Sequence, residues 1–276
     1  MEAALSHLQA VTLSAPAESL ESYRLPKEPT RHPAADFELH LVSTRTTTAP
    51  APSATLEWGD VRPREDSETA TRVVNVIVAF IGLIVAAPLM LIVALLVRLT
   101  SRGPVIYTQT RVGVDRRYNR SYEYDRRIND QGGKPFKMYK FRSMVIDSEK
   151  DGRAVWAERK DPRATPIGRV LRQTRLDELP QLYNVLRGDM NIVGPRPERP
   201  SIFAELRQNI PQYHMRQRVR PGITGWAQVN QQYDGCLDDV KRKVSYDLEY
   251  IGRRSVREDL RIMSMTIPVM IRHTGW

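Results

Sequence analysis

The hydropathy pattern of the chain contains one long apolar run, at residues 73–97. As a straight helix this run would reach about 37 Å, and the hydrocarbon core of a bilayer is only ~30 Å thick. Pro88 lies inside the run and would clash with the carbonyl of Ile84, so it predicts a break in the helix near Ala87. Because the run has no polar face, it is not typical of a helix buried in a soluble core.

Both flanks of the apolar run are basic, and their charge bears on how the helix meets the membrane. Cytoplasmic segments carry the excess of Lys and Arg, so both ends are expected on the cytoplasmic side. A re-entrant helix, which enters the membrane, breaks at Pro88 and returns, satisfies both observations. A helix that crosses the membrane with a proline kink is the alternative that hydropathy alone favours. The basic residues are Arg62, Arg64 and Arg72 before the run and Arg98, Arg102 and Arg111 after it.

Shorter patterns follow towards the C-terminus. Residues 105–110 and 136–141 predict two strands of a β-hairpin. Between them, residues 114–133 mix arginines with tyrosines, which suits either contact with nucleic acid or lipid headgroups or a solvated hairpin extension. The last of the predicted helices could pack in the core or lie in the membrane interface. Helices are expected at residues 148–159, 167–175, 240–252 and 257–272.

The N-terminal region differs from the rest in composition and charge. Residues 1–70 are rich in Pro, Ala, Ser and Thr without an apolar period, so we expect a disordered tail. This region holds 6 Lys/Arg and 11 Asp/Glu, a net charge of −5, so the total of +10 leaves +15 for the remainder. The excess of positive charge on the remainder of the chain indicates an anionic partner, namely phosphate esters, nucleic acid or a membrane face. The alternative is that these Lys and Arg residues only cover a solvated surface. Cys236 is the single cysteine, which excludes an internal disulfide, and the scattered histidines make zinc unexpected.

The candidate chemistry is concentrated at two adjacent acids, Asp177 and Glu178. Pro180 is tolerated only in a first helical turn, so a helix should begin here with Asp177 as its N-cap. Neighbouring carboxylates can hold a hard cation such as Mg²⁺, and a helix start favours bound anions. Arg172 and Arg175, just before the acids, could neutralise charge on a transferring phosphoryl group. The alternative is that the acids only cap the helix.

Two rigid turns follow the acid pair. Residues 194–200 contain three prolines, which fix the backbone and would aim Arg196 at a phosphate, unless the run is only a linker. Residues 220–226 form a second turn, where Gly222 and Gly225 would allow close approach to a ligand. Trp226 could be a core anchor or a ring at the membrane interface.

With these features in order, the chain resembles the bacterial sugar transferases called monotopic phosphoglycosyl transferases over about residues 72–272. Each shared motif is weak alone, but their number and order are specific. Besides the apolar helix with its central proline, the motifs are KFRSM (140–144), DPR (161–163), LDELPQL (176–182), NVL (184–186), GDM (188–190), VGPRPE (193–198) and RPGITGWAQV (220–229).

The resemblance implies a two-step reaction. Asp177 would attack the sugar-proximal phosphorus of a UDP-sugar and release UMP, and undecaprenyl phosphate would then take the phosphosugar from the enzyme. Glu178 would be the partner acid, with Mg²⁺ required at the pair. Arg196 would bind phosphate, and the remaining predicted substrate-binding residues are Lys140, Arg172, Arg220 and Asp259.

The expected fold is mainly α with a small β-hairpin. It divides into a tail at residues 1–70, a re-entrant membrane helix at 71–99 and a cytoplasmic catalytic domain at 100–276. The expected partners are UDP-sugar, undecaprenyl phosphate and membrane lipid at the bacterial inner membrane, with no nucleic acid, in the initiation of exopolysaccharide or glycoconjugate synthesis. A non-catalytic membrane adaptor of a polysaccharide assembly complex is the alternative. The identity of the sugar and the oligomeric state, a homodimer included, stay open.

The sequence departs from the family pattern at several points. Ala87 replaces the serine that often precedes the helix proline, and Arg175 stands where a serine or threonine commonly precedes the leucine of the acid motif. The segment at residues 114–133 is longer than the usual hairpin. We find no counterpart of the four-helix membrane bundle of longer relatives.

Overall fold

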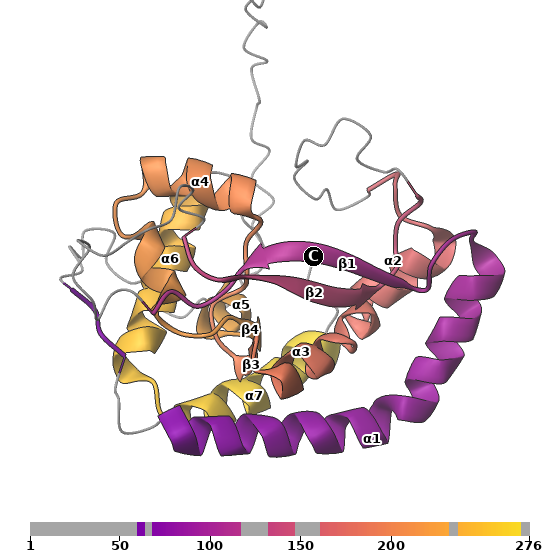
Figure 1. Ribbon diagram of the computed structural model, residues 1–276, viewed down its shortest axis with the longest axis horizontal. Helices are drawn as coiled ribbons and strands as arrows, with labels where there is room; N and C mark the ends of the chain where they lie inside the picture. Colours follow the sequence, from indigo (N-terminus) through magenta and orange to yellow (C-terminus); the bar gives the residue numbers. More distant parts are fainter. Residues whose placement is uncertain (1–59, 64–67, 117–131, 147–160, 232–236, 272–276) are drawn as a thin grey trace, which may run out of the picture. The chain divides into compact units, whose positions relative to one another are not determined.

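A computed structural model describes residues 60–63, 68–116, 132–146, 161–231 and 237–271, all within one compact unit. This part is mostly helical with a small β-hairpin, as expected, and it also has a second two-stranded sheet that was not predicted. The predictions for residues 1–59, 117–131 and 148–159 lie outside the described residues. The elements are α1 (Glu68–Thr100), β1 (Ile106–Val112), β2 (Pro135–Phe141), α2 (Pro166–Gln173), η4 (Leu176–Glu178), α3 (Gln181–Arg187), β3 (Asn191–Val193), α4 (Pro200–Asn209), η5 (Tyr213–Arg218), β4 (Gly222–Thr224), α5 (Trp226–Asn230), α6 (Leu237–Arg253) and α7 (Val256–Ile271) (Figure 1).

The apolar run forms α1, a helix of 33 residues that continues through Pro88. The ribbon turns part-way along its length, which we attribute to the hydrogen bond that Pro88 cannot donate (Figure 1). The predicted break is therefore a bend within one helix. Within the described residues, α1 is the one helix long and apolar enough to cross a membrane.

The two halves of α1 pack against the same compact unit. Near its start, Arg72 donates hydrogen bonds to the carbonyls of Val185 (2.6 Å) and Leu186 (2.8 Å) at the end of α3. Near its end, Val97 packs with Phe141 and Leu171. The Arg142 guanidinium donates to the carbonyl of Ser101 just beyond the helix at 2.7 Å. Between these anchors the helix exposes large apolar side chains: Ile81, Ile84, Val85, Leu91 and Ile92.

The predicted hairpin is confirmed. Strands β1 and β2 pair antiparallel with Tyr107 opposite Lys140. The buried Asn184 of α3 binds the free edge of β2, because its side chain donates to the Lys137 carbonyl at 2.7 Å and accepts from the Tyr139 N–H at 3.0 Å. Asn184 thus takes the place of a neighbouring strand and fixes the register of β2 relative to α3.

The second sheet brings the two predicted turns together. Strands β3 and β4 pair in parallel, with Val193 opposite Thr224. A Cβ added at Gly222 would lie 2.1 Å from the backbone nitrogen of Gly194, and one at Gly225 would lie 2.3 Å from the carbonyl oxygen of Gly194. Another part of the backbone therefore makes a close approach to both glycines.

The C-terminal helices close the core. Trp226 acts as an anchor within the protein, since its Nε1–H donates to Glu249 at 2.9 Å and the Arg253 guanidinium lies 4.4 Å from its ring. Ile262 of α7 is fully buried, whereas Ile267 is exposed, so α7 has both a core face and an uncovered apolar face.

The region predicted as an N-terminal tail overlaps the fold. Val61 packs against the main core, and its carbonyl accepts a hydrogen bond from Arg218. The helix that follows begins at Glu68, ahead of the predicted boundary at residue 71.

Candidate active site

The acid pair lies in a 3₁₀ turn, η4, directly before α3. Arg175 precedes this turn with φ 56°, and it is the one non-glycine residue with positive φ in the described part of the chain. The prediction that Asp177 is an N-cap is wrong, because α3 begins only at Gln181 and Pro180 occupies the cap position without a side-chain hydrogen bond. Pro180 separates the two helical segments, which leaves the Asp177 carboxylate free of a capping role.

Glu178 is held by two cations from distant parts of the chain. It is 6% exposed, and its Oε1 accepts from Lys140 Nζ and from Arg196 Nη2, each at 2.8 Å. Burial alone would raise the pKa of Glu178, but Arg196 and Lys140 outweigh it and hold the pKa below its usual value. Glu178 is therefore a fixed anion that aligns both cations.

Asp177 is equally buried but has a different environment. Only 6% of the surface of Asp177 is exposed, yet its carboxylate makes no hydrogen bond or ion pair with any residue that the structure describes. Burial raises its pKa, the charge of Glu178 adds to this effect, and Lys140 opposes it. Two neighbouring carboxylates whose pKa values are pushed apart have different roles. Here Glu178 stays ionised, and Asp177 is the group available to act as a nucleophile or base.

The turn that presents Arg196 is held through its backbone. Prolines at positions 195 and 197 cannot donate hydrogen bonds, so the turn is fixed by what its carbonyls accept. Four consecutive carbonyls have protein donors: Pro195 accepts from Gly222 N (3.0 Å), Arg196 from Arg216 Nη2 (3.1 Å), Pro197 from Arg111 Nη1 (3.0 Å) and Glu198 from Val112 N (2.9 Å). The turn that presents Arg196 is therefore held in place as expected, and the phosphate-binding role of Arg196 stays a prediction.

A buried ionic network supports this turn. Arg216, whose side chain is fully buried, donates to Asp247 Oδ2 at 2.6 Å and to the Tyr213 hydroxyl at 2.7 Å. Glu198 pairs with Lys243 at 3.2 Å. Burial raises the pKa of Glu198, but Lys243 and other cations lower it to about 2. Sequence reasoning missed Arg216 and Asp247, because a single arginine or aspartate in an amphipathic segment carries no local signal.

The other predicted site residues have different partners. Arg172 lies 3.7 Å from Asp161, which also pairs with Arg163 at 2.7 Å, so the DPR motif packs beside α2. Arg220 donates to the Gly188 carbonyl at 3.1 Å and pairs with Glu68 at 2.9 Å, which joins the end of α3 to the start of α1.

Asp259 is connected through the Tyr250 hydroxyl to Val193, just before the turn that presents Arg196. It is 1% exposed and accepts from the Tyr250 hydroxyl at 2.8 Å, and the same hydroxyl lies 3.2 Å from the Val193 carbonyl. Of the five predicted substrate-binding residues, the structure thus brings two into contact with the acid pair, namely Lys140 and Arg196.

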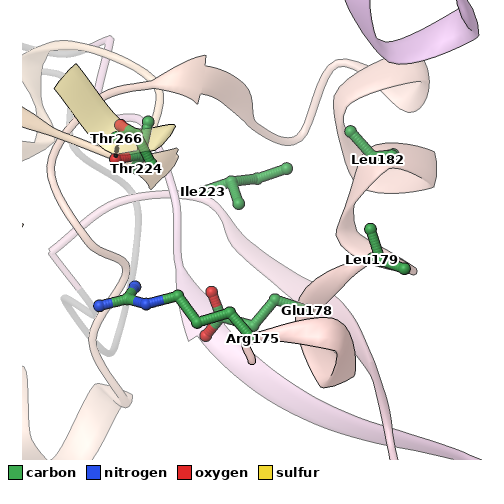
Figure 2. A pocket seen from close by; sticks show the side chains of 7 residues that line it. All are labelled: Arg175, Glu178, Leu179, Leu182, Ile223, Thr224 and Thr266. Carbon is green, nitrogen blue, oxygen red and sulfur yellow. Dashed lines mark hydrogen bonds between the residues drawn. The ribbon is translucent and has the colours of Figure 1, made fainter. Parts of the chain in front are cut away.

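A cavity of about 100 Å³ adjoins the acid pair. Arg175 and Glu178 supply its charged side, and Leu179, Leu182 and Ile223 supply apolar walls (Figure 2). Thr224 and Thr266 complete the lining, with their hydroxyls 2.8 Å apart. The cavity lies close to α1, since a Cβ at Gly82 would be 3.3 Å from Leu182 Cδ1.

The acid pair fits a magnesium ion that takes most of its ligands from elsewhere. In the described residues there is no group of three or more His, Cys, Asp or Glu side chains that could hold a metal. Mg²⁺, however, commonly uses one or two carboxylates together with water and substrate phosphates. Asp177 has no internal partner, and Glu178 contacts its two cations through Oε1 only. Both acids therefore retain oxygens for such an ion.

Comparison with known proteins gives consistent matches. Residues 66–273 match the family described as bacterial sugar transferase. A UDP-N-acetylgalactosamine-undecaprenyl-phosphate N-acetylgalactosaminephosphotransferase of Aeromonas hydrophila is 40% identical over 79% of this chain and 48% of that protein. A UDP-glucose:undecaprenyl-phosphate glucose-1-phosphate transferase of Escherichia coli (strain K12) is 41% identical over 71% of this chain and 39% of that protein. The chain thus spans about half or less of these relatives. It covers 81% of a putative undecaprenyl-phosphate N-acetylgalactosaminyl 1-phosphate transferase of Bacillus subtilis (strain 168), at 48% identity over 57% of this chain.

Proposed function

Because this chain belongs to the bacterial sugar transferase family, we propose that it moves a sugar 1-phosphate from a UDP-sugar to undecaprenyl phosphate and releases UMP. The product would start the assembly of an exopolysaccharide or glycoconjugate. The observation that carries the proposal is the contrast within the acid pair. Glu178 is tied to Lys140 and Arg196, whereas Asp177 has no partner among the described residues.

In the first step, an Asp177 carboxylate oxygen attacks the sugar-proximal phosphorus of the UDP-sugar. The bond from this phosphorus to the bridging oxygen breaks, UMP leaves with the electron pair, and the phosphosugar remains as an acyl phosphate on Asp177. Arg196 and Lys140 lie at the same site and offset charge on the phosphoryl oxygens. Mg²⁺, held by Asp177 and Glu178 with the substrate phosphates, would supply further positive charge.

In the second step, a phosphate oxygen of undecaprenyl phosphate attacks the same phosphorus. The bond to Asp177 breaks and its carboxylate is regenerated, so no net proton is taken up or released. Because Asp177 acts twice, its freedom from a capping hydrogen bond matters for both steps.

We propose further that α1 enters the cytoplasmic leaflet and returns to the same side. Its start is bound to α3 through Arg72 and its end to β2 and α2 through Val97, within one compact unit. If α1 crossed the bilayer, its two ends would lie on opposite sides of the ~30 Å hydrocarbon core, and they could not both bind the same compact unit. The exposed apolar side chains between the anchors provide the surface that lipid would cover.

The activity is tested by UMP release from UDP-sugars in the presence of Mg²⁺ and undecaprenyl phosphate. Wild-type protein should release UMP with one UDP-sugar of a panel that includes UDP-glucose and UDP-N-acetylgalactosamine, and Asp177→Asn should abolish it. Release of UDP would contradict the mechanism. If Asp177→Asn and Arg196→Ala both leave polysaccharide formation in cells unchanged, the protein is an adaptor.

Membrane topology has its own experiment. Cys236 is first replaced by serine, and single cysteines are then placed at Ala70 and Arg102, beside the two ends of α1. A membrane-impermeant maleimide should label both positions from the cytoplasmic side only. Labelling from opposite sides would show that α1 crosses the membrane.

A further inference from the structure

Arg175 has an unusual backbone conformation directly before the acid pair. Its φ of 56° lies in the left-handed region, which residues with a Cβ rarely adopt. Such a conformation persists where the surroundings impose it, and it is concentrated at functional sites. Here it directs the side chain of Arg175 into the lining of the cavity beside Glu178 (Figure 2).

The guanidinium of Arg175 is uncommitted. Lys140 and Arg196 are both bound to Glu178, whereas the Arg175 side chain makes no hydrogen bond or ion pair with the residues that the structure describes. Burial lowers its pKa, which is the expected effect on a half-buried cation without a close partner. The cavity therefore contains a cation that is available to a ligand.

The remaining lining of the cavity is mainly apolar, although the Glu178 carboxylate, which is paired with Lys140 and Arg196, and the Thr224 and Thr266 side chains also contribute to it. Leu179, Leu182 and Ile223 line it, and Leu182 also lies against α1 at Gly82. A suitable ligand is anionic at one end and apolar at the other, and it approaches from the side of the apolar helix. A UDP-sugar is polar throughout and does not match these walls, whereas the phosphate end of an isoprenoid lipid does.

We propose that Arg175 and this cavity form the subsite for the acceptor's head group. The Arg175 guanidinium binds the phosphate of a polyprenyl phosphate, and Leu179, Leu182 and Ile223 contact its first isoprene unit. The cavity has about 100 Å³, less than the roughly 150 Å³ of a cavity that binds benzene, so it can take only the head of the lipid, and the rest of the chain must lie outside it. The inference rests on the proposed function and adds a residue where the family commonly has serine or threonine.

Variants of Arg175 test the subsite in the full-length protein. Asparagine tolerates the left-handed conformation, so Arg175→Asn removes the charge without a new backbone conflict, and Arg175→Lys retains the charge. Arg169→Asn is the matched control, because Arg169 is an exposed arginine on the preceding helix α2. Two quantities are measured: the burst of UMP formed without acceptor, and the KM for undecaprenyl phosphate.

Arg175→Asn should raise the KM for undecaprenyl phosphate about tenfold, the effect of losing one charge-assisted hydrogen bond. The burst amplitude and the KM for UDP-sugar should not change. Arg175→Lys should recover most of the loss, and Arg169→Asn should behave as wild type. A changed burst or UDP-sugar KM with an unchanged acceptor KM would assign Arg175 to the donor phosphates and overturn the proposal, as would an Arg175→Asn variant without any effect.

A binding measurement separates this inference from the proposed activity. Farnesyl phosphate should raise the Tm of the wild type and of Arg175→Lys but not of Arg175→Asn, and farnesol should have little effect on any of them. An equal shift for wild type and Arg175→Asn would refute the subsite. If no UDP-sugar yields UMP but farnesyl phosphate still gives the charge-dependent shift, the proposed reaction fails and the lipid-phosphate subsite stands.

Discussion

Replacing Arg216 with methionine is expected to lower the free energy of unfolding by about 4 kcal/mol, because breaking one partner of a buried ion pair typically costs ~3–5 kcal/mol. The Arg216 side chain is fully buried and donates to Asp247 at 2.6 Å, to the Tyr213 hydroxyl at 2.7 Å and to the Arg196 carbonyl at 3.1 Å. Methionine fills a similar volume but leaves all three acceptors without this donor.

The loss should depend on pH in a predictable direction. Burial raises the pKa of Asp247, and Arg216 opposes that rise. Without Arg216 the pKa of Asp247 in the folded protein should rise further, so the folded state binds a proton more tightly than the unfolded chain. Stability then falls as pH increases. Arg216→Met should therefore be less destabilised at pH 6 than at pH 8.

The assay is unfolding of the detergent-solubilised protein followed by tryptophan fluorescence, with a double-mutant cycle. Arg216→Met combined with Asp247→Leu should recover most of the loss, because it removes both charges and fills the space with apolar groups. Lys241→Met is the control, since the Lys241–Asp238 pair is exposed and its loss should leave the stability nearly unchanged. If the double variant loses the sum of its single variants, the two residues do not stabilise the turn as a pair.

Three further predictions concern titration and anchoring. Because burial raises the pKa of Asp177, the rate of the UMP burst should fall as pH decreases from neutrality, at a higher pH than an ordinary aspartate would cause; a rate that stays constant down to pH 5 would contradict this. Burial also raises the pKa of Asp259 to about 6, and its Oδ2 has no hydrogen-bond partner in the described residues. Stability should therefore decline as pH rises from about 4 to 6, and Asp259→Asn should abolish that decline and stabilise the protein at pH 8 by up to about 3 kcal/mol in denaturant unfolding. Arg72→Leu removes both hydrogen bonds to the end of α3 and should lower the stability by about 1–2 kcal/mol, with a measurable drop in Tm; an unchanged Tm would show that this anchor is not needed.

Sequence patterns predicted several of the elements, because the periods of these elements are local, but they did not predict α4 or the strands β3 and β4. The apolar run at α1, the hairpin strands and the helices near residues 167, 240 and 257 all follow from spacing over a few residues. Pro180 does mark the start of a helix, since it occupies the cap position of α3, but the inference that Asp177 is the N-cap was wrong. A 3₁₀ segment of three residues is too short for its sequence pattern to be distinguished from that of the first turn of an α-helix.

By itself the sequence determined the residues to which we assign the chemistry: two adjacent acids, an arginine between prolines and an apolar helix with a central proline. Only the tertiary structure decided which of these side chains pair with one another and which are left without a partner. Lys140 and Arg196 are 38 and 18 residues from Glu178 along the chain, yet both bind it, and this leaves Asp177 and Arg175 without partners among the described residues. No local pattern encodes such contacts, because they depend on how β2, the 3₁₀ turn and the Arg196 turn pack together.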